Sequence, residues 1–334
     1  MSYQLQSNAM PSKILYVDSR DASIYLSNNT SYFQYELREK IEVPLNQRVL
    51  ISLNSATIPY SFYNIRTDIN NKLKIQLENT TQGTTDNFEL QIDAGNYDVY
   101  SLSTFIENFI NNTVLVGTNV TIVIDYNNDK QKFIYNLSKT DDTIPNDQYF
   151  LKFRFDDTVI TQTPHIEMGF NQNSLMTMLI TSSTAGASST SQLVSTNVVD
   201  VNGSIHGIYV RTNLVSNGTL DTQSGTFSNI LSRIPINVNS GGIIFATPNN
   251  ATHRSIVDLR TIDILTIRLT DERNRILDLN GLDFQIAISI DFLYAQRKIT
   301  LPMGSLNQSN FGFSHIDDKK EKIKKDTKIK NSRK

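Results

Sequence analysis

The residues of this chain that could do chemistry are few and widely spaced. The four histidines, His165, His206, His253 and His315, lie far apart in the chain, and His165 has a carboxylate two residues on, at Glu167. On a β-strand, residues two apart share a face, so this pair could begin a metal site. The signal is weak, and an ordinary surface or hydrogen-bonded histidine is the preferred interpretation.

A second group of polar residues resembles a calcium-binding loop at first sight. It consists of Asp271, Asn274, Asp278, Asn280 and Asp283. The spacing departs from the pattern of calcium loops, and no glutamate follows at the required distance. Aspartate, asparagine and glycine are also the usual residues of turns, so we interpret this group as turns at strand ends.

Motifs of nucleotide binding and of nucleophilic catalysis are absent from the sequence. It contains no G-x-G-x-x-G, no Gly-Lys-Ser/Thr and no G-x-S-x-G. The chain has no cysteine, which excludes disulfides, thiolate zinc sites and cysteine nucleophiles. We therefore predict no catalytic, cofactor-binding or metal-binding residue, no cofactor and no enzymatic activity.

Strands are the elements that must position any site in this chain. From 282 to 292 every even-numbered residue is apolar, a period of two that only a β-strand places on one face. Similar alternation predicts strands around 33–37, 49–53, 73–77, 88–92, 120–126, 133–137, 149–155, 208–210 and 265–269, and the turn at 127–129 predicts a hairpin. The run Ile243, Ile244 and Phe245 is interpreted as a short buried strand.

One segment has helical spacing instead. Leu102, Phe105, Ile106 and Phe109 follow the i, i+3, i+4, i+7 pattern of an amphipathic helix, which would cover the edge or face of a sheet. Ser101 is the expected N-cap. Residues 182–191 are rich in serine and threonine and are predicted to form a flexible loop, where an insertion could return to the main domain.

Charge is distributed unevenly along the chain. Residues 317–334 contain nine Lys or Arg and four Asp or Glu, a net charge of 9 − 4 = +5, whereas the whole chain carries −2, which leaves −7 for residues 1–316. Any contact with nucleic acid would therefore belong to the basic tail, Lys319–Lys334. No signal peptide and no apolar run of membrane-spanning length is seen, and we expect folding in the cytosol.

Two blocks carry a resemblance to a known family. The first is Leu50–Ile65, with its Ile-Pro-Tyr and Tyr-Asn-Ile elements, preceded by Tyr16–Asp21. The second runs from Asn229 to Tyr294 and includes Leu277-Asp-Leu-Asn-Gly-Leu-Asp-Phe284. Together they resemble the penton (minor capsid) proteins of virophages and of related polinton-like and giant DNA viruses.

The resemblance implies an all-β fold, a single jelly-roll β-sandwich with an inserted β-rich segment that carries one helix. We expect the sandwich at 12–95 and 200–300, the insertion at 96–199, and a C-terminal extension with a disordered basic tail at 301–334. A double jelly roll would need about twice as many strands and is rejected. The family further implies homopentamers at the fivefold vertices of an icosahedral virion, contact with a double jelly-roll major capsid protein, and assembly in the host cytoplasm.

Two other function classes remain open at this stage. A glycan- or receptor-binding β-sandwich would use Asn, Asp and Tyr side chains in its loops, although the chain lacks tryptophan, a common platform for sugars. A β-sandwich hydrolase would need two carboxylates at a set separation, which a sequence cannot reveal.

Overall fold

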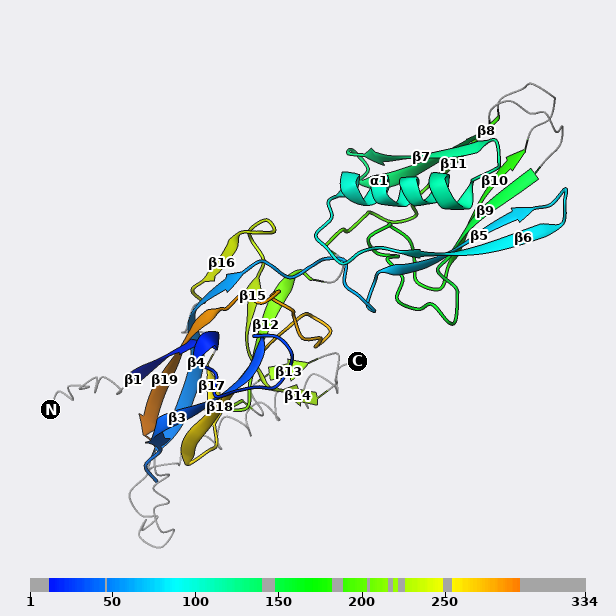
Figure 1. Ribbon diagram of the computed structural model, residues 1–334. Helices are drawn as coiled ribbons and strands as arrows, with labels where there is room; N and C mark the ends of the chain where they lie inside the picture. The colour runs from blue at the N-terminus through cyan, green and yellow to red at the C-terminus, as the bar shows by residue number, and fades with distance from the viewer. Residues whose placement is uncertain are drawn as a thin grey trace, which may run out of the picture. The chain divides into compact units, whose positions relative to one another are not determined.

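The computed structural model describes residues 12–45, 47–139, 148–181, 189–202, 205–215, 219–221, 226–248 and 254–294. The described chain consists of antiparallel strands and a single α-helix, α1 (Figure 1). The all-β prediction is thereby confirmed.

Sheet A of the sandwich has the strand order β1-β19-β4-β16, with β17 also paired to β4. The strands are β1 (Ser12–Asp18), β4 (Gln47–Pro59), β16 (Ile243–Ala246), β17 (Ser255–Val257) and β19 (Gln285–Tyr294). All of their pairings are antiparallel, and β19 pairs with β4 over most of its length.

Sheet B has the strand order β15-β12-β18-β3-β2. Its strands are β2 (Ile24–Tyr25), β3 (Tyr32–Glu42), β12 (Gly207–Thr212), β15 (Ile230–Pro235) and β18 (Thr261–Thr270). A short hairpin of β13 (Thr219–Asp221) and β14 (Thr226–Ser228) forms a separate pair.

The order of the strands identifies the sandwich as a jelly roll. Its eight main strands, in chain order, are β1, β3, β4, β12, β15, β16, β18 and β19. Counted from one to eight, they run 1-8-3-6 in sheet A and 5-4-7-2 in sheet B. This is the interleaved arrangement of two Greek keys that defines a jelly roll.

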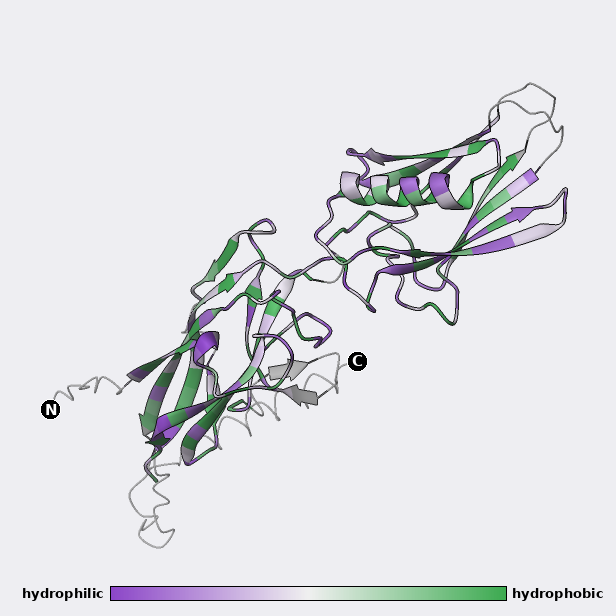
Figure 2. Cartoon of the chain, in the orientation of Figure 1, coloured by the Kyte–Doolittle hydropathy of each residue, from purple (hydrophilic) through white to green (hydrophobic). Residues whose placement is uncertain are grey.

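The core of the sandwich lies between the inward faces of the two sheets. The alternation predicted for 282–292 is found in β19, where Ile286, Ile288, Ile290 and Phe292 are buried together with Phe284. Leu282 is an exception, because it precedes the strand and is half exposed. Figure 2 shows the resulting alternation of hydrophobic and hydrophilic colour along the strands.

The residues between β4 and β12 are here called the insertion, and its part from Ile65 to Val199 forms a second core. Sheet C has the order β10-β9-β5-β6 and sheet D the order β11-β8-β7. The bounds are β5 (Lys72–Asn79), β6 (Thr84–Gln91), β7 (Val120–Asn127), β8 (Lys132–Lys139), β9 (Gln148–Arg154), β10 (Leu175–Thr181) and β11 (Ser189–Val194). The predicted hairpin around 127–129 is confirmed by the pairing of β7 with β8.

This packing differs from the predicted division of the chain. Strands β5 and β6 fall in the range 12–95 that we assigned to the sandwich, but β5 pairs with β9, and Leu73, Ile75 and Leu90 are buried in the second core. Ile65 is the first residue of that core in chain order. Alternation alone shows that a strand has a buried face, and it does not show which core covers that face.

The helix α1 (Val99–Phe109) covers the edge of sheet D and continues into a short π-helix, Ile110–Val114. Its Glu107 carboxylate accepts the backbone N–H of Ile124 in β7, and Asn111 pairs with the N–H and C=O of Ile122. The sequence therefore predicted the role of the helix correctly. The predicted cap was wrong, because Asp98 is the N-cap and Ser101 is its partner in a capping box.

Several predicted features lie partly or wholly outside the described residues. Within the predicted loop 182–191, residues 189–191 belong to strand β11, which pairs with β8, and 182–188 are outside the described part. The C-terminal extension 301–334, with the basic tail, is also outside it.

Candidate interaction surface

The outer face of sheet A is the candidate contact surface of this fold. Because Val17, Ile286 and Ile58 point into the core, their neighbours along β1, β19 and β4 point the other way. The ladder places these outward residues in rows across the sheet. Asp18 opposes Gln285, Gln285 opposes Thr57, and Thr57 opposes Phe245 of β16.

Large apolar side chains stand at both edges of this face, and small ones lie between them. On β1 the exposed residues are Tyr16, 77% exposed, and Ile14; on β16 they are Ile243 and Phe245, each 62% exposed. The central strands place small side chains on this face, namely Ser289, Ser55 and Thr57 together with Ala287 and Ser52, of which the last two are buried. Exposed apolar groups on one face of a sheet are typical of a contact surface for another protein.

The exposure of β16 corrects our interpretation of Ile243, Ile244 and Phe245 as a buried run. Only Ile244 is buried, while its two neighbours are exposed. The reason is that sheet A is one layer of a two-layer sandwich, so β16 has a single face against the core. A run of three apolar residues indicates a buried strand only where both faces of the sheet are covered.

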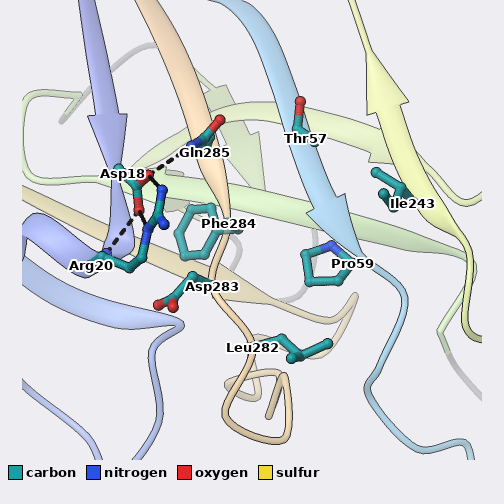
Figure 3. A pocket seen from close by; sticks show the side chains of 9 residues that line it. All are labelled: Asp18, Arg20, Thr57, Pro59, Ile243, Leu282, Asp283, Phe284 and Gln285. Carbon is teal, nitrogen blue, oxygen red and sulfur yellow. Dashed lines mark hydrogen bonds and ion pairs between the residues drawn. The ribbon is translucent and has the colours of Figure 1, made fainter.

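A hollow lies where the outer face meets the turn that precedes β19 (Figure 3). Its apolar side is formed by Pro59, Ile243 and Leu282, and its polar side by Asp18, Arg20 and Asp283. The two sides come from segments far apart in the chain, which the jelly-roll order of the strands brings together. The hollow thus combines apolar contact area with charged groups of both signs.

The polar side of the hollow is held in place by a dense set of hydrogen bonds. Arg20 donates from Nε and from a terminal nitrogen to the two oxygens of Asp18, at 2.9 and 2.5 Å, and Gln285 donates to Asp18 at 2.7 Å. The hydrogen bond with the Arg20 side chain holds the pKa of Asp18 well below its ordinary value. Asp283 accepts the Ser19 hydroxyl at 2.7 Å. The charged side chains are therefore fixed before any partner arrives.

The structure separates the two residues of the candidate metal pair. His165 and Glu167 lie in a turn and not on a strand, so they do not share a face. The His165 ring contacts the hydroxyl and carbonyl oxygens of Thr163, each at 3.0 Å. Glu167 is buried and accepts the Asn70 side-chain amide at 2.5 Å. Each residue has its own protein partner.

The calcium-like group consists of turn residues, as predicted, and one of them has a further role. Asp278 accepts the N–H of Asn280 in a local turn. Asp271 is fully buried and accepts the backbone N–H groups of Arg273 and Arg275. It also pairs with the Arg275 Nε at 2.7 Å and with the Arg66 guanidinium at 3.1 Å.

The ion pair of Arg66 with Asp271 was not predicted, and it joins the insertion to the sandwich. Arg66 follows β4 and adjoins Ile65 of the second core, whereas Asp271 follows β18 of sheet B. Directly before β12, His206 Nε2 also contacts Asp200 at 3.1 Å. Sequence offers no signal for the pair of Arg66 with Asp271, since the two residues are 205 positions apart.

The other expected site residues are either dispersed or outside the described part of the chain. His253 and His315 are both outside it. Within the described residues, no three His, Asp or Glu side chains gather closely enough to hold a metal ion. The same part of the chain contains no helix that is both long and apolar enough to cross a membrane.

Comparison with known proteins gives likenesses among solved structures. No family model matches the chain, and no curated protein matches it. Among solved structures, the crystal structure of the mavirus penton protein is similar, with a TM-score of 0.46 and 12% sequence identity; the match covers 85% of this chain and 100% of that chain. A likeness at this level carries no argument, so the jelly-roll assignment rests on the strand order.

Proposed function

We propose that this chain is a structural capsid protein that assembles with copies of itself into a pentamer at the vertices of an icosahedral virion. The observation that carries the proposal is the outer face of sheet A, with large exposed apolar side chains on both of its edges. The sequence resemblance supplies the class of assembly, since both of its blocks fall mainly within the sandwich strands.

A closed ring requires that each subunit offer two different surfaces. Strands β1 and β16 stand at opposite edges of sheet A, and each leaves one side of its backbone outside the ladder. In the proposed ring, the β16 edge of one copy, with Ile243 and Phe245, meets the β1 side of the next copy, with Ile14 and Tyr16. Such a contact is heterologous, and it closes if the rotation between copies is 72° (one fifth of a turn).

The remaining roles belong to the same proposal. We assign the sandwich to β1–β4 and β12–β19, and the insertion to the residues between β4 and β12. The insertion core then begins near Ile65, and not at residue 96 as the sequence predicted. The major capsid protein around each vertex is the proposed neighbour, packaged DNA is the proposed contact of the tail Lys319–Lys334, and assembly would occur in the host cytoplasm. In this role the protein forms part of a capsid shell and catalyses no reaction.

The oligomeric state of the purified full-length chain tests the proposal directly. Light scattering coupled to size-exclusion chromatography should give five times the 37.8 kDa of the chain, and negative-stain images should show five-membered rings. Two results together would contradict the proposal: a purified chain that stays monomeric over the accessible range of concentration, and virions whose vertices contain another protein.

A pair of variants tests whether the outer face of sheet A makes the contact. Phe245→Asp places a charge on the exposed side of β16 and should leave a folded monomer. Val116→Asp is the matched control, because Val116 is 66% exposed but belongs to the insertion, after the π-helix. If both variants still form rings, the proposed surface is wrong even if the pentamer is right.

A further inference from the structure

A cluster of buried and half-buried charged groups lies where the chain passes between the sandwich and the insertion. It consists of Arg66 and Glu167 from the insertion and Asp271 and Arg275 from the turn after β18. This cluster is separate from the outer face of sheet A, so its role is independent of the proposed assembly.

Arg66 contacts one carboxyl group directly and is linked to a second through Asn70. A terminal nitrogen of its guanidinium donates to Asp271 at 3.1 Å, but its Nε is buried and has no hydrogen-bond partner among the described residues. Its side chain is only 13% exposed, so water does not readily supply the missing bond. A second acceptor with negative charge would therefore be favoured on the other side of the guanidinium.

Glu167 is that second carboxyl group. It is 3% exposed, and it accepts a hydrogen bond from the neutral amide of Asn70 and not from a cation. Asn70 also accepts the backbone N–H of Arg66 and donates to the carbonyl of Asn64, so the carboxyl group is tied to the segment that leads out of β4. The charge of Arg66 acts on Glu167 as well.

We propose that Glu167 and Asp271 share Arg66 in a pH-sensitive latch between the insertion and the sandwich. With Glu167 neutral, Arg66 is held by Asp271 of the sandwich and the latch is closed. When Glu167 loses its proton, its charge attracts Arg66 toward the insertion and weakens the pair with Asp271, so the latch loosens as pH rises.

The electrostatics of the cluster give the range of pH. Burial raises the pKa of Glu167 from 4.5 to about 7, with the charge of Asp200 acting in the same direction and the Asn70 amide and Arg66 opposing it. Because the pKa of Glu167 is higher in the closed state, its protonated form stabilises that state relative to the open one. This stabilisation is lost as pH rises from 4.5 through about 7. Asp200, whose pKa burial also raises, has the same sign.

Other titratable groups around the cluster also contribute to the pH dependence, and their effects must be distinguished from that of Glu167. His165 lies in the same turn, and burial lowers its pKa, with Arg273 contributing, so its titration acts in the opposite sense. Asp200 faces His206, which in turn lies near Glu272. Because these groups are common to the wild type and to a variant at 167, a comparison of the two removes their contributions.

The experiment compares the wild type with Glu167→Gln, which retains an oxygen for Asn70 but cannot ionise. Hydrogen–deuterium exchange of peptides covering 64–72 and 268–276, corrected for intrinsic rates, gives the opening equilibrium of the latch. Between pH 5 and pH 7.5 the ratio of the wild-type opening constant to that of the variant should rise by roughly 50-fold. Glu89→Gln, at an exposed glutamate of β6, is the control and should follow the wild type.

Equal pH dependence in the wild type and in Glu167→Gln would overturn the proposal. If the variant does not fold, carboxyl-labelled glutamate in the wild type gives the same answer by NMR. One carboxyl resonance should titrate near pH 7, and Asp271→Asn should raise exchange in the same peptides at every pH. Titration of all glutamates near the ordinary value would refute the latch without bearing on the pentamer, which is measured separately.

Discussion

Replacement of Asp271 by asparagine tests how much the cluster of Arg66, Glu167, Asp271 and Arg275 contributes to stability. The carboxylate is fully buried and receives four hydrogen bonds, two from backbone N–H groups and two from guanidinium groups. The asparagine side chain has nearly the same volume, but an NH2 group at the position of Oδ2 would face the donors of both Arg66 and Arg275. The change therefore removes charge and acceptor capacity with little loss of packing.

The expected loss of stability follows from the burial of the two cations. Arg66 is 13% exposed and would be left without its counter-charge, a situation that typically costs about 3–5 kcal/mol. Arg275 is 31% exposed and adds less, because water can solvate it. We expect Asp271→Asn to lower the free energy of unfolding by about 3–5 kcal/mol, measured by urea denaturation followed by circular dichroism.

A control and a second variant distinguish the buried pair from a general effect of charge. Asp263→Asn removes a carboxylate that is 46% exposed and pairs with the exposed Lys40, so it should cost no more than about 1 kcal/mol. Adding Arg66→Met to Asp271→Asn should recover part of the loss, because it removes the uncompensated charge. A loss below about 1 kcal/mol for Asp271→Asn, or no recovery in the double variant, would refute this reasoning.

Three further substitutions test the cores and the backbone, each by the same denaturation assay. Tyr135→Phe should leave stability unchanged or raise it by up to about 1 kcal/mol, since the Tyr135 hydroxyl is buried without a partner in the described part of the chain; a clear loss would contradict this. Gly169→Ala should cost at least about 1 kcal/mol more stability than Gly83→Ala. Both glycines have a positive φ, but of the two only Gly169 would bring the new Cβ close to a backbone oxygen, at 2.7 Å. Equal costs would refute the close contact. Ile244→Ala should cost about 2–5 kcal/mol, because Ile244 is buried, and Phe245→Ser less than about 1 kcal/mol, because Phe245 is exposed. Similar losses would contradict the exposure of the outward face of β16.

Much of the fold could be predicted from the sequence, because each strand records its own buried face. In β18, Leu265, Ile267 and Leu269 alternate as predicted and are fully buried. Which core covers a strand is decided by partners elsewhere in the chain. For that reason the sequence correctly indicated strands at 73–77 and 88–92 but not their place in the second core.

The candidate surface was less accessible to prediction than the fold. Ile243 and Phe245 have the composition of a buried strand, and only their place on the outer face of sheet A shows that they are exposed. Asp271 was recognised as a turn residue, which it is, but its pair with Arg66 depends on a contact across 205 positions. Single-residue patterns contain no information of that kind.

The pairing of the first strand with the last has a consequence for how the protein is made. Ser12 of β1 lies opposite Asp291 of β19, so 291 − 12 = 279 positions separate two neighbours in one ladder. The strands of the insertion, by contrast, are consecutive, from β5 to β11. On the ribosome the insertion can therefore fold first, while β1, β3 and β4 wait for partners that have not been synthesised. Those waiting strands are where we expect chaperones to bind the nascent chain.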